Sequence, residues 1–129
     1  MPLNISNVKD IVFTVDGILE ASTYYKHWPF KNWTYNLIPW EQVKGVDNDP
    51  LDFITIYESQ NFTLNGKGLV DGLGYKWWVR EWAHKNKGRP NLLRMERVQT
   101  AEITGLELRN SPRWTTTLTD IDSFYIHDM

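Results

Sequence analysis

Apolar residues recur along this chain in short alternating runs, and no run has the period of a sustained helix. Ile11, Phe13 and Val15 occupy alternate positions, which is typical of a strand with one buried face. Asp16-Gly17 then predicts a corner, and residues 18–19 predict a second short strand. Further short strands are predicted at residues 51–57, 92–95, 101–103, 106–108, 114–118 and 124–126.

The passage from residue 61 to residue 78 is the most informative part of the chain. It reads as a short apolar run that is interrupted by Gly66, Gly68, Gly72 and Gly74 and ends on two tryptophans. Repeated glycines indicate a backbone that needs positive φ or close approach, which is costly for residues with a Cβ. The passage therefore predicts a chain that turns corners.

Two longer stretches interrupt the strands. Residues 22–50 have no clear periodicity and predict an irregular excursion that Trp28, Trp33 and Trp40 anchor to the body. Residues 75–90 predict a second excursion, with one or two helical turns over residues 77–84 that stop before Gly88-Arg89-Pro90.

The short strands repeat at a regular spacing. Residues 62–64, 101–103 and 124–126 occupy equivalent places, and residues 69–70 and 106–108 follow the first two of them. The period is in the low twenties once the insertion near residues 76–90 is removed, which is typical of a β-solenoid whose coils stack in parallel. An antiparallel hairpin sandwich is the competing architecture. The sandwich accounts less well for equivalent residues that recur at a fixed spacing along the sequence.

Composition excludes several classes of function. The chain has 129 residues, enough for one domain, and no cysteine, so disulfides, thiolate chemistry and cysteine-based zinc sites are excluded. His27, His84 and His127 have no metal-binding spacing, and we expect no metal and no cofactor. The chain has seven Trp, six Tyr and five Phe, and we expect most of these rings to fill a core.

Charge is unevenly distributed. Residues 76–97 hold seven basic and two acidic residues, a local charge of +5 within a net charge of −2, which leaves −7 for the remainder. The basic segment is either a solvated loop face or a surface for a polyanion. The acidic remainder and the lack of nucleic-acid-binding motifs argue against nucleic acid.

No targeting segment is visible in the printed chain. It has no apolar run near the roughly 18 residues needed to span a bilayer, so we expect no membrane partner, and it has no signal peptide. Three glycosylation sequons, at Asn4, Asn32 and Asn61, indicate a secretory origin.

Two motifs resemble those of glycoside hydrolase family 28, the polygalacturonases and their relatives. Residues 68–74 read Gly-Leu-Val-Asp-Gly-Leu-Gly and precede Trp77-Trp78, which is similar to the family's Asp-Gly-x-Gly, Trp-Trp passage. Residues 105–114 read Gly-Leu-Glu-Leu-Arg-Asn-Ser-Pro-Arg-Trp, which resembles its Gly-Leu-x-Leu-x-Asn-Ser-Pro-x-Trp coil. Arg89-Pro90 between them and residues 15–21 before them match family segments too, so the likeness covers nearly the whole chain.

The resemblance implies an all-β fold, a right-handed parallel β-helix with a short helical or irregular insertion near residues 76–90. It also implies a cleft for pectic polysaccharide, mostly polygalacturonate, and inverting hydrolysis of α-1,4-galacturonosyl linkages without a cofactor. Such hydrolysis needs an acid and a base about 6.5–9.5 Å apart. The resemblance places them in Asn-Thr-Asp and Asp-Asp segments, assisted by Gly-His-Gly and Arg-x-Lys segments.

None of these four segments occurs in the 129 residues. The carboxylate pairs at residues 47–49 and 120–122 do not match the family's pattern. We therefore expect residues 1–129 to be a partial β-helix domain, the early coils of a secreted or cell-wall enzyme, cut at both ends. We assign it no catalytic residue and expect it to be inactive alone. An edge left open by such a cut predicts self-association.

Individual residues receive the following roles. Asp71 is expected to cap its own corner, Asn110 to bond along the stack of coils and Pro112 to shape its turn. Trp77, Trp78 and Trp114 are expected to be core or loop anchors rather than sugar platforms. The candidate uronate-binding residues are His84, Arg109 and Arg113, because arginine pairs bidentately with carboxylates. The alternative function is a non-catalytic solenoid that binds an acidic glycan or a protein through its basic insertion.

Overall fold

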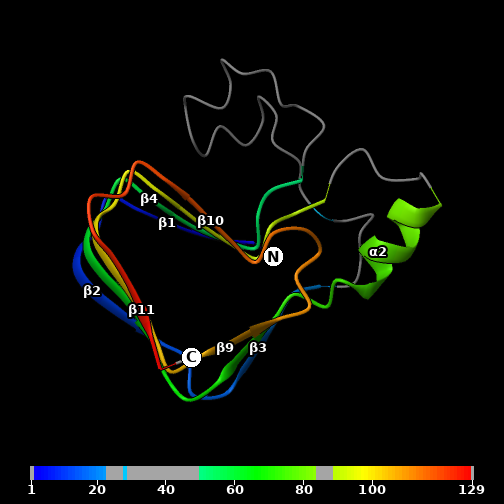
Figure 1. Ribbon diagram of the computed structural model, residues 1–129, viewed down its shortest axis with the longest axis horizontal. Helices are drawn as coiled ribbons and strands as arrows, with labels where there is room; N and C mark the ends of the chain where they lie inside the picture. The colour runs from blue at the N-terminus through cyan, green and yellow to red at the C-terminus, as the bar shows by residue number, and fades with distance from the viewer. Residues whose placement is uncertain (1, 23–27, 29–49, 84–88, 129) are drawn as a thin grey trace.

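Every strand of the computed structural model pairs in parallel with strands from neighbouring coils. The structure describes residues 2–22, 28, 50–83 and 89–128. The first three coils each contribute one strand to each of three sheets, and the described part of the fourth coil contributes a strand to two of them: sheet A (β1-β4-β7-β10), sheet B (β2-β5-β8-β11) and sheet C (β3-β6-β9). Figure 1 looks along the stack, with sheet A along the top, sheet B on the left and sheet C at the lower right.

The strands follow one another in the same order in each coil. The first coil contains β1 (Leu3–Ser6), β2 (Lys9–Thr14) and β3 (Ile18–Glu20). The second contains β4 (Ile54–Tyr57), β5 (Gln60–Asn65) and β6 (Leu69–Asp71), and helix α2 (Tyr75–Trp82) follows it. The third contains β7 (Leu93–Glu96), β8 (Gln99–Thr104) and β9 (Glu107–Arg109), and the fourth β10 (Thr116–Thr119) and β11 (Phe124–His127).

The register confirms the repeat that the sequence predicts. Leu64 pairs with Ile103, 39 residues on, and Ile103 pairs with Ile126, 23 residues on. Phe13 of the first coil pairs with Leu64, so these four residues form one column across the strands of sheet B. The parallel β-helix is therefore confirmed and the antiparallel sandwich is wrong. Strand β1 was not predicted, because Leu3 and Ile5 lie before the first clear alternation of apolar residues.

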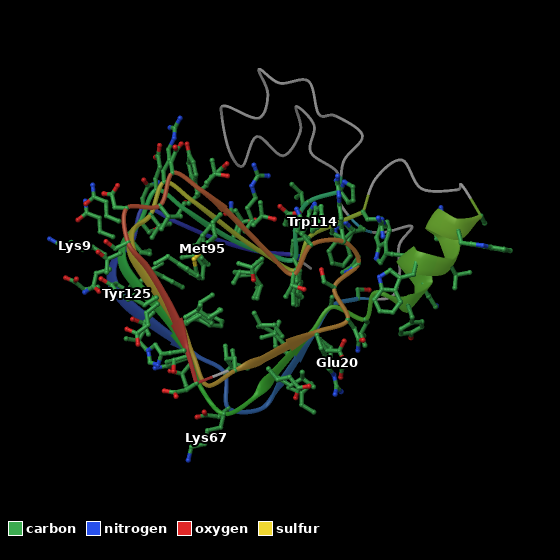
Figure 2. The ribbon with its side chains drawn as sticks, viewed as in Figure 1. Lys9, Glu20, Lys67, Met95, Trp114 and Tyr125 are labelled. Atoms are coloured by element: carbon green, nitrogen blue, oxygen red, sulfur yellow. The ribbon has the colours of Figure 1, made fainter. Side chains whose placement is uncertain are left out.

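Alternate side chains of each strand fill the space between the three sheets. Ile56 and Met95 lie on neighbouring strands of sheet A, and both are completely buried. Figure 2 shows Met95 pointing into the interior, whereas Lys9, Lys67 and Tyr125 lie on the outside. Burial of the inward face explains why the buried residues of β5 and β8 are two positions apart.

A left-handed residue makes the corner from sheet A to sheet B in every coil. This residue follows the sheet A strand, and it is Asn7 (φ 56°), Glu58 (49°), Arg97 (53°) or Asp120 (53°). The conformation costs about 1–2 kcal/mol for a residue with a Cβ. Its recurrence at one place shows that the tight corner of the coil requires it.

Helix α2 confirms the helical turns predicted within the second excursion. It lies outside the coil, beside the corner between sheet C and sheet A (Figure 1). Most of the first excursion, with Trp33 and Trp40, lies outside the described residues. Trp28 is described and buried, with 4% of its surface exposed, which agrees with its predicted role as an anchor.

Candidate functional site

The two motifs that carry the family resemblance contact each other at the corner between sheet C and sheet A. The Gly72 N–H donates to the Arg109 carbonyl (2.9 Å), and the Gly74 N–H donates to the Asn110 carbonyl (2.8 Å). A Cβ at Gly72 or Gly74 would lie 2.7 or 2.6 Å from the Asn110 oxygen. Both positions therefore exclude a side chain. We call residues 71–74 and 109–114 the stacked corner.

Asp71 is the centre of polar contacts within the stacked corner. One carboxylate oxygen accepts the Leu73 N–H (2.9 Å) and the Asn110 amide (3.1 Å), and the other faces Arg109 Nε at 3.4 Å. Burial would raise the pKa of Asp71, but these three donors outweigh it and hold the pKa below its ordinary value. The predicted capping role of Asp71 and the bond of Asn110 along the stack are both confirmed.

Arg109 is half exposed, but the solenoid already engages its guanidinium. Arg109 Nε faces Asp71, and Nη1 lies 3.6 Å from Glu107 Oε1. These two carboxylates orient the side chain along the edge of sheet C. A ligand uronate at Arg109 therefore has to share the guanidinium with them.

The other two candidate residues are less constrained or not described. Arg113 is exposed in the loop between β9 and β10, and no described residue forms an ion pair with it. His84 lies outside the described residues. The structure thus brings Arg109 and Arg113 to the same corner and leaves His84 unplaced.

Helix α2 is anchored to the coil through one face. Trp77 is 3% exposed and packs edge to face on Trp28, with 6.1 Å between ring centroids. The Trp28 indole N–H in turn donates to the Leu51 carbonyl (2.6 Å). The predicted anchoring role of Trp77 is confirmed, and the anchor joins α2 to the start of the second coil.

A side chain of α2 and one from the residues that follow it hold the loop between β9 and β10. The Trp78 indole donates to the Ser111 carbonyl (3.0 Å), and Arg89 Nη1 donates to the Pro112 carbonyl (2.9 Å). Trp78 is therefore a loop anchor, as predicted. Trp114 was predicted to be a core residue or a loop anchor, and its exposed fraction of 62% shows that the core alternative is wrong. The Trp114 carbonyl accepts the Leu92 N–H, so its backbone does the anchoring.

A buried charge cluster on the outer face of sheet A was missed by sequence reasoning. Arg94 Nη2 lies 3.1 Å from Glu96 Oε1, and Arg94 Nη1 lies 3.6 Å from Asp52 Oδ2. The three side chains are 12%, 3% and 1% exposed, in the order Arg94, Glu96, Asp52. Strand alternation places Arg94 and Glu96 on one face, and that pattern was the available signal. Asp52 also accepts the Asn91 N–H, so the cluster fixes the entry to β7.

A second titratable cluster lies on sheet B, away from the stacked corner. His127 Nε2 lies 2.7 Å from Glu102 Oε1, and Nδ1 lies 2.9 Å from Asp128 Oδ2. The hydrogen bond with Asp128, and then that with Glu102, favours the charged imidazole and raises the pKa of His127. The cluster ties β11 to β8 when His127 is protonated.

Three buried carboxylates among the described residues are paired with arginines. Asp71, Asp52 and Glu96 are each engaged by an arginine, so none of them is a free acid or base beside a free partner. Among the described residues no three His, Asp or Glu side chains are grouped to hold a metal ion. No helix in this part of the chain is long and apolar enough to cross a membrane.

The family model described as "Glycosyl hydrolases family 28" matches residues 2–129. Exopolygalacturonase A of Aspergillus niger is 34% identical over 69 residues, which are 54% of this chain and 16% of that protein. A polygalacturonase of Cryptomeria japonica is 35% identical over 60 residues, 41% of this chain and 12% of its own length. Endopolygalacturonase A of Aspergillus awamori is 26% identical over 106 residues, 82% of this chain and 24% of its own length. The chain thus spans about a quarter or less of these curated relatives.

Proposed function

This chain belongs to glycosyl hydrolase family 28, and from that premise we propose that it forms the early coils of a pectin-degrading polygalacturonase. The substrate is polygalacturonate, and the reaction is hydrolysis of its galacturonosyl linkages with inversion. The enzyme acts outside the cell, where pectin lies. The three relatives described above carry the name polygalacturonase, with exo- and endo-acting enzymes among them.

The observation that carries this proposal is the stacked corner. The residues that resemble the family's two motifs lie 39 residues apart in sequence, and in the fold they contact each other through Asp71 and Asn110. Gly72 and Gly74 are required because the Asn110 carbonyl occupies the space that a Cβ would take. A chance likeness between two short motifs gives no reason for such a contact.

Within the enzyme these coils have a supporting and binding role. Arg113 is exposed at the stacked corner and can pair with a uronate carboxylate, and Arg109 adds a second, shared guanidinium. The acid and base come from Asn-Thr-Asp and Asp-Asp segments, which the 129 residues do not contain. Residues 1–129 alone therefore bind uronate without cleaving it.

Two assays test the proposal. The purified 129 residues are incubated with polygalacturonate, and we expect no release of reducing ends above a buffer blank. The product of the whole reading frame that encodes these residues is then assayed in the same way, and we expect hydrolysis with inversion at the anomeric carbon. If the protein encoded by the whole reading frame cleaves no pectic substrate, the proposal is overturned. If the 129 residues alone cleave polygalacturonate, the assignment of the acid and base to segments outside them is overturned.

One observation favours the alternative, a non-catalytic solenoid that binds an acidic glycan or a protein. Lys76 is exposed beside the stacked corner within a basic segment, and Arg113 is exposed in the loop next to it. The reading frame discriminates between the two functions. If the codons after residue 129 encode Asn-Thr-Asp and Asp-Asp segments, the enzyme is favoured. If a stop codon comes before such segments, the binding module is favoured.

Self-association is a further property that we propose for the purified 129 residues. β1 and β10 are the outer strands of sheet A, and β2 and β11 those of sheet B, so each presents one backbone edge. Open parallel edges pair readily with other strands. Static light scattering should show a mass above that of the monomer, and a clean monomer over the concentration range would contradict the idea.

A further inference from the structure

Helix α2 exposes a stripe of large apolar side chains. Tyr75, Trp78, Val79 and Trp82 follow the spacing i, i+3, i+4, i+7, which places them on one side of a helix. Their exposed fractions are 49%, 42%, 66% and 85%. Three aromatic rings on one exposed side of an eight-residue helix form a marked surface feature.

The exposed stripe is not needed to hold α2 in place. The helix is attached through Trp77, which lies on its opposite side against Trp28. Of the stripe residues, only Trp78 at its margin has a described anchoring contact, through its indole N–H to Ser111. Trp82 is 85% exposed, and its ring is available to a partner.

Basic side chains lie beside the stripe. Lys76 and Arg80 are four residues apart, so they form a second row on α2 that borders Val79. The first turn of the helix contains no acidic residue, and the last turn contains Arg80. The exposed Arg113 adds positive charge in the loop that Trp78 anchors. An apolar partner alone would gain nothing from this charge.

We propose that α2 is a binding platform for an anionic polysaccharide, with Tyr75 and Trp82 stacking on sugar rings while Lys76 pairs with carboxylates. The flat C–H faces of a pyranose pack on aromatic rings, whose amphipathic character suits a surface that stays wet. A polyuronate carries one carboxylate on every ring, so it matches a row of rings bordered by a row of cations. The choice of polygalacturonate as the probe rests on the function proposed above.

The test measures binding of the purified chain to oligogalacturonates of about 12 units by isothermal titration calorimetry. We expect Trp82→Ala to raise Kd by about tenfold, as for the removal of a central aromatic contact. Tyr75→Ala should act in the same direction. Tyr125→Ala is the matched control, because Tyr125 is 56% exposed on β11, and it should leave Kd unchanged. Thermal melts of each variant establish that the fold is kept.

Charge is tested separately. Lys76→Gln should weaken binding of oligogalacturonate by about threefold, and added salt should remove this difference. Neutral galactan oligosaccharides of equal length should bind more weakly than oligogalacturonate. Equal binding of the two glycans, or no effect of Lys76→Gln at low salt, would overturn the anionic specificity.

Other results would overturn the platform itself. An unchanged Kd for Trp82→Ala, or an equal loss for Tyr125→Ala, would show that the rings of α2 do not contact the glycan. A concentration-dependent dimer that Trp82→Ala abolishes, without glycan binding, would assign the stripe to a second copy of the chain. The function proposed above is tested independently of this platform. It requires pectin hydrolysis by the protein that the whole reading frame encodes, whether or not Trp82 affects Kd.

Discussion

Ile103 and Ile126 are the same residue in the same column of sheet B, yet Ile103 is completely buried and Ile126 is 52% exposed. Sheet A shows the same contrast between Met95, completely buried, and Leu118, 40% exposed. The buried members have a described coil on both sides, and the exposed members have one on one side only. At equivalent inward-facing positions, burial is therefore decided by the number of neighbouring coils and not by the residue type.

The contrast has an energetic consequence. Removing apolar surface from water stabilises a protein by about 25 cal/mol per Å². A substitution in the second or third coil loses contacts with two neighbouring coils and leaves a cavity, whereas one in the fourth coil removes a side chain that water already reaches. Equal changes at Ile103 and Ile126 should thus have unequal effects, and four predictions break or sharpen this comparison.

The largest effect is expected from a pair of truncations in the sheet B column. Ile103→Ala should lower the free energy of unfolding by about 2–5 kcal/mol, the usual cost of a buried isoleucine cavity. Ile126→Ala should cost less than half as much, because its side chain is already half exposed. Urea unfolding followed by circular dichroism measures both values. Equal losses of unfolding free energy would show that the contribution of a residue in this column does not depend on how many coils flank it.

The stacked corner offers a pair of glycine substitutions. Gly72→Ala places a Cβ 2.7 Å from the Asn110 carbonyl oxygen, so the third coil has to move away from the second. The expected cost is about 1–3 kcal/mol, as for other overpacked sites. Gly17→Ala is the matched control, because nothing lies within 4 Å of the position that a Cβ would take at this residue of the first coil. If the two variants have equal midpoints in urea, the corner is not tightly packed.

Asp71 links the same two coils by charge. Its pKa is lower in the folded state than in the unfolded chain, so its charge stabilises the fold above the unfolded pKa, and this contribution is lost as pH falls through the folded pKa. Asp71→Asn should therefore cost about 1–3 kcal/mol at pH 7 and progressively less in acid. Asp120→Asn, at an exposed corner, is the control. A difference between Asp71→Asn and the native chain that is independent of pH would contradict this account.

The smallest effect is expected at His127, which joins the fourth coil to the third. Its pKa is raised in the folded state, so its stabilising effect is complete below the unfolded pKa and is lost as pH rises through the folded pKa. His127→Gln should lower the Tm at pH 5 and change it little at pH 8. Scanning calorimetry at the two values measures the difference. A larger loss at pH 8 would assign His127 a different role.

Local pattern predicted much of the fold and part of the site. The column that joins Leu64, Ile103 and Ile126 was visible because strand alternation and glycine corners recur at a spacing that needs no knowledge of contacts. The capping role of Asp71 was visible because an Asp-Gly corner is a local structure. The left-handed Glu58 and Arg97 were not visible, since neither residue type favours that conformation.

Contacts between coils were beyond the reach of local pattern. The sequence offered Arg109 as a ligand for a uronate, but the fold places it beside Asp71, 38 residues away. Arg94 likewise lies 3.6 Å from Asp52, which precedes β4 in the second coil, and local pattern gave no sign of this pair. Tryptophan is a large apolar residue that often packs in a core, but the ring of Trp114 at the stacked corner is exposed.

The sequence by itself determined the parallel β-helix, its repeat and the family, because each depends on residue types at short spacings that a single coil imposes. Only the tertiary structure decided which charges are engaged, which rings are exposed and which isoleucine is buried. The physical reason is that side chains in a solenoid meet across coils, between residues 23 to 51 positions apart. Insertions between coils set those distances, and the hydrophobic pattern within a coil does not encode them.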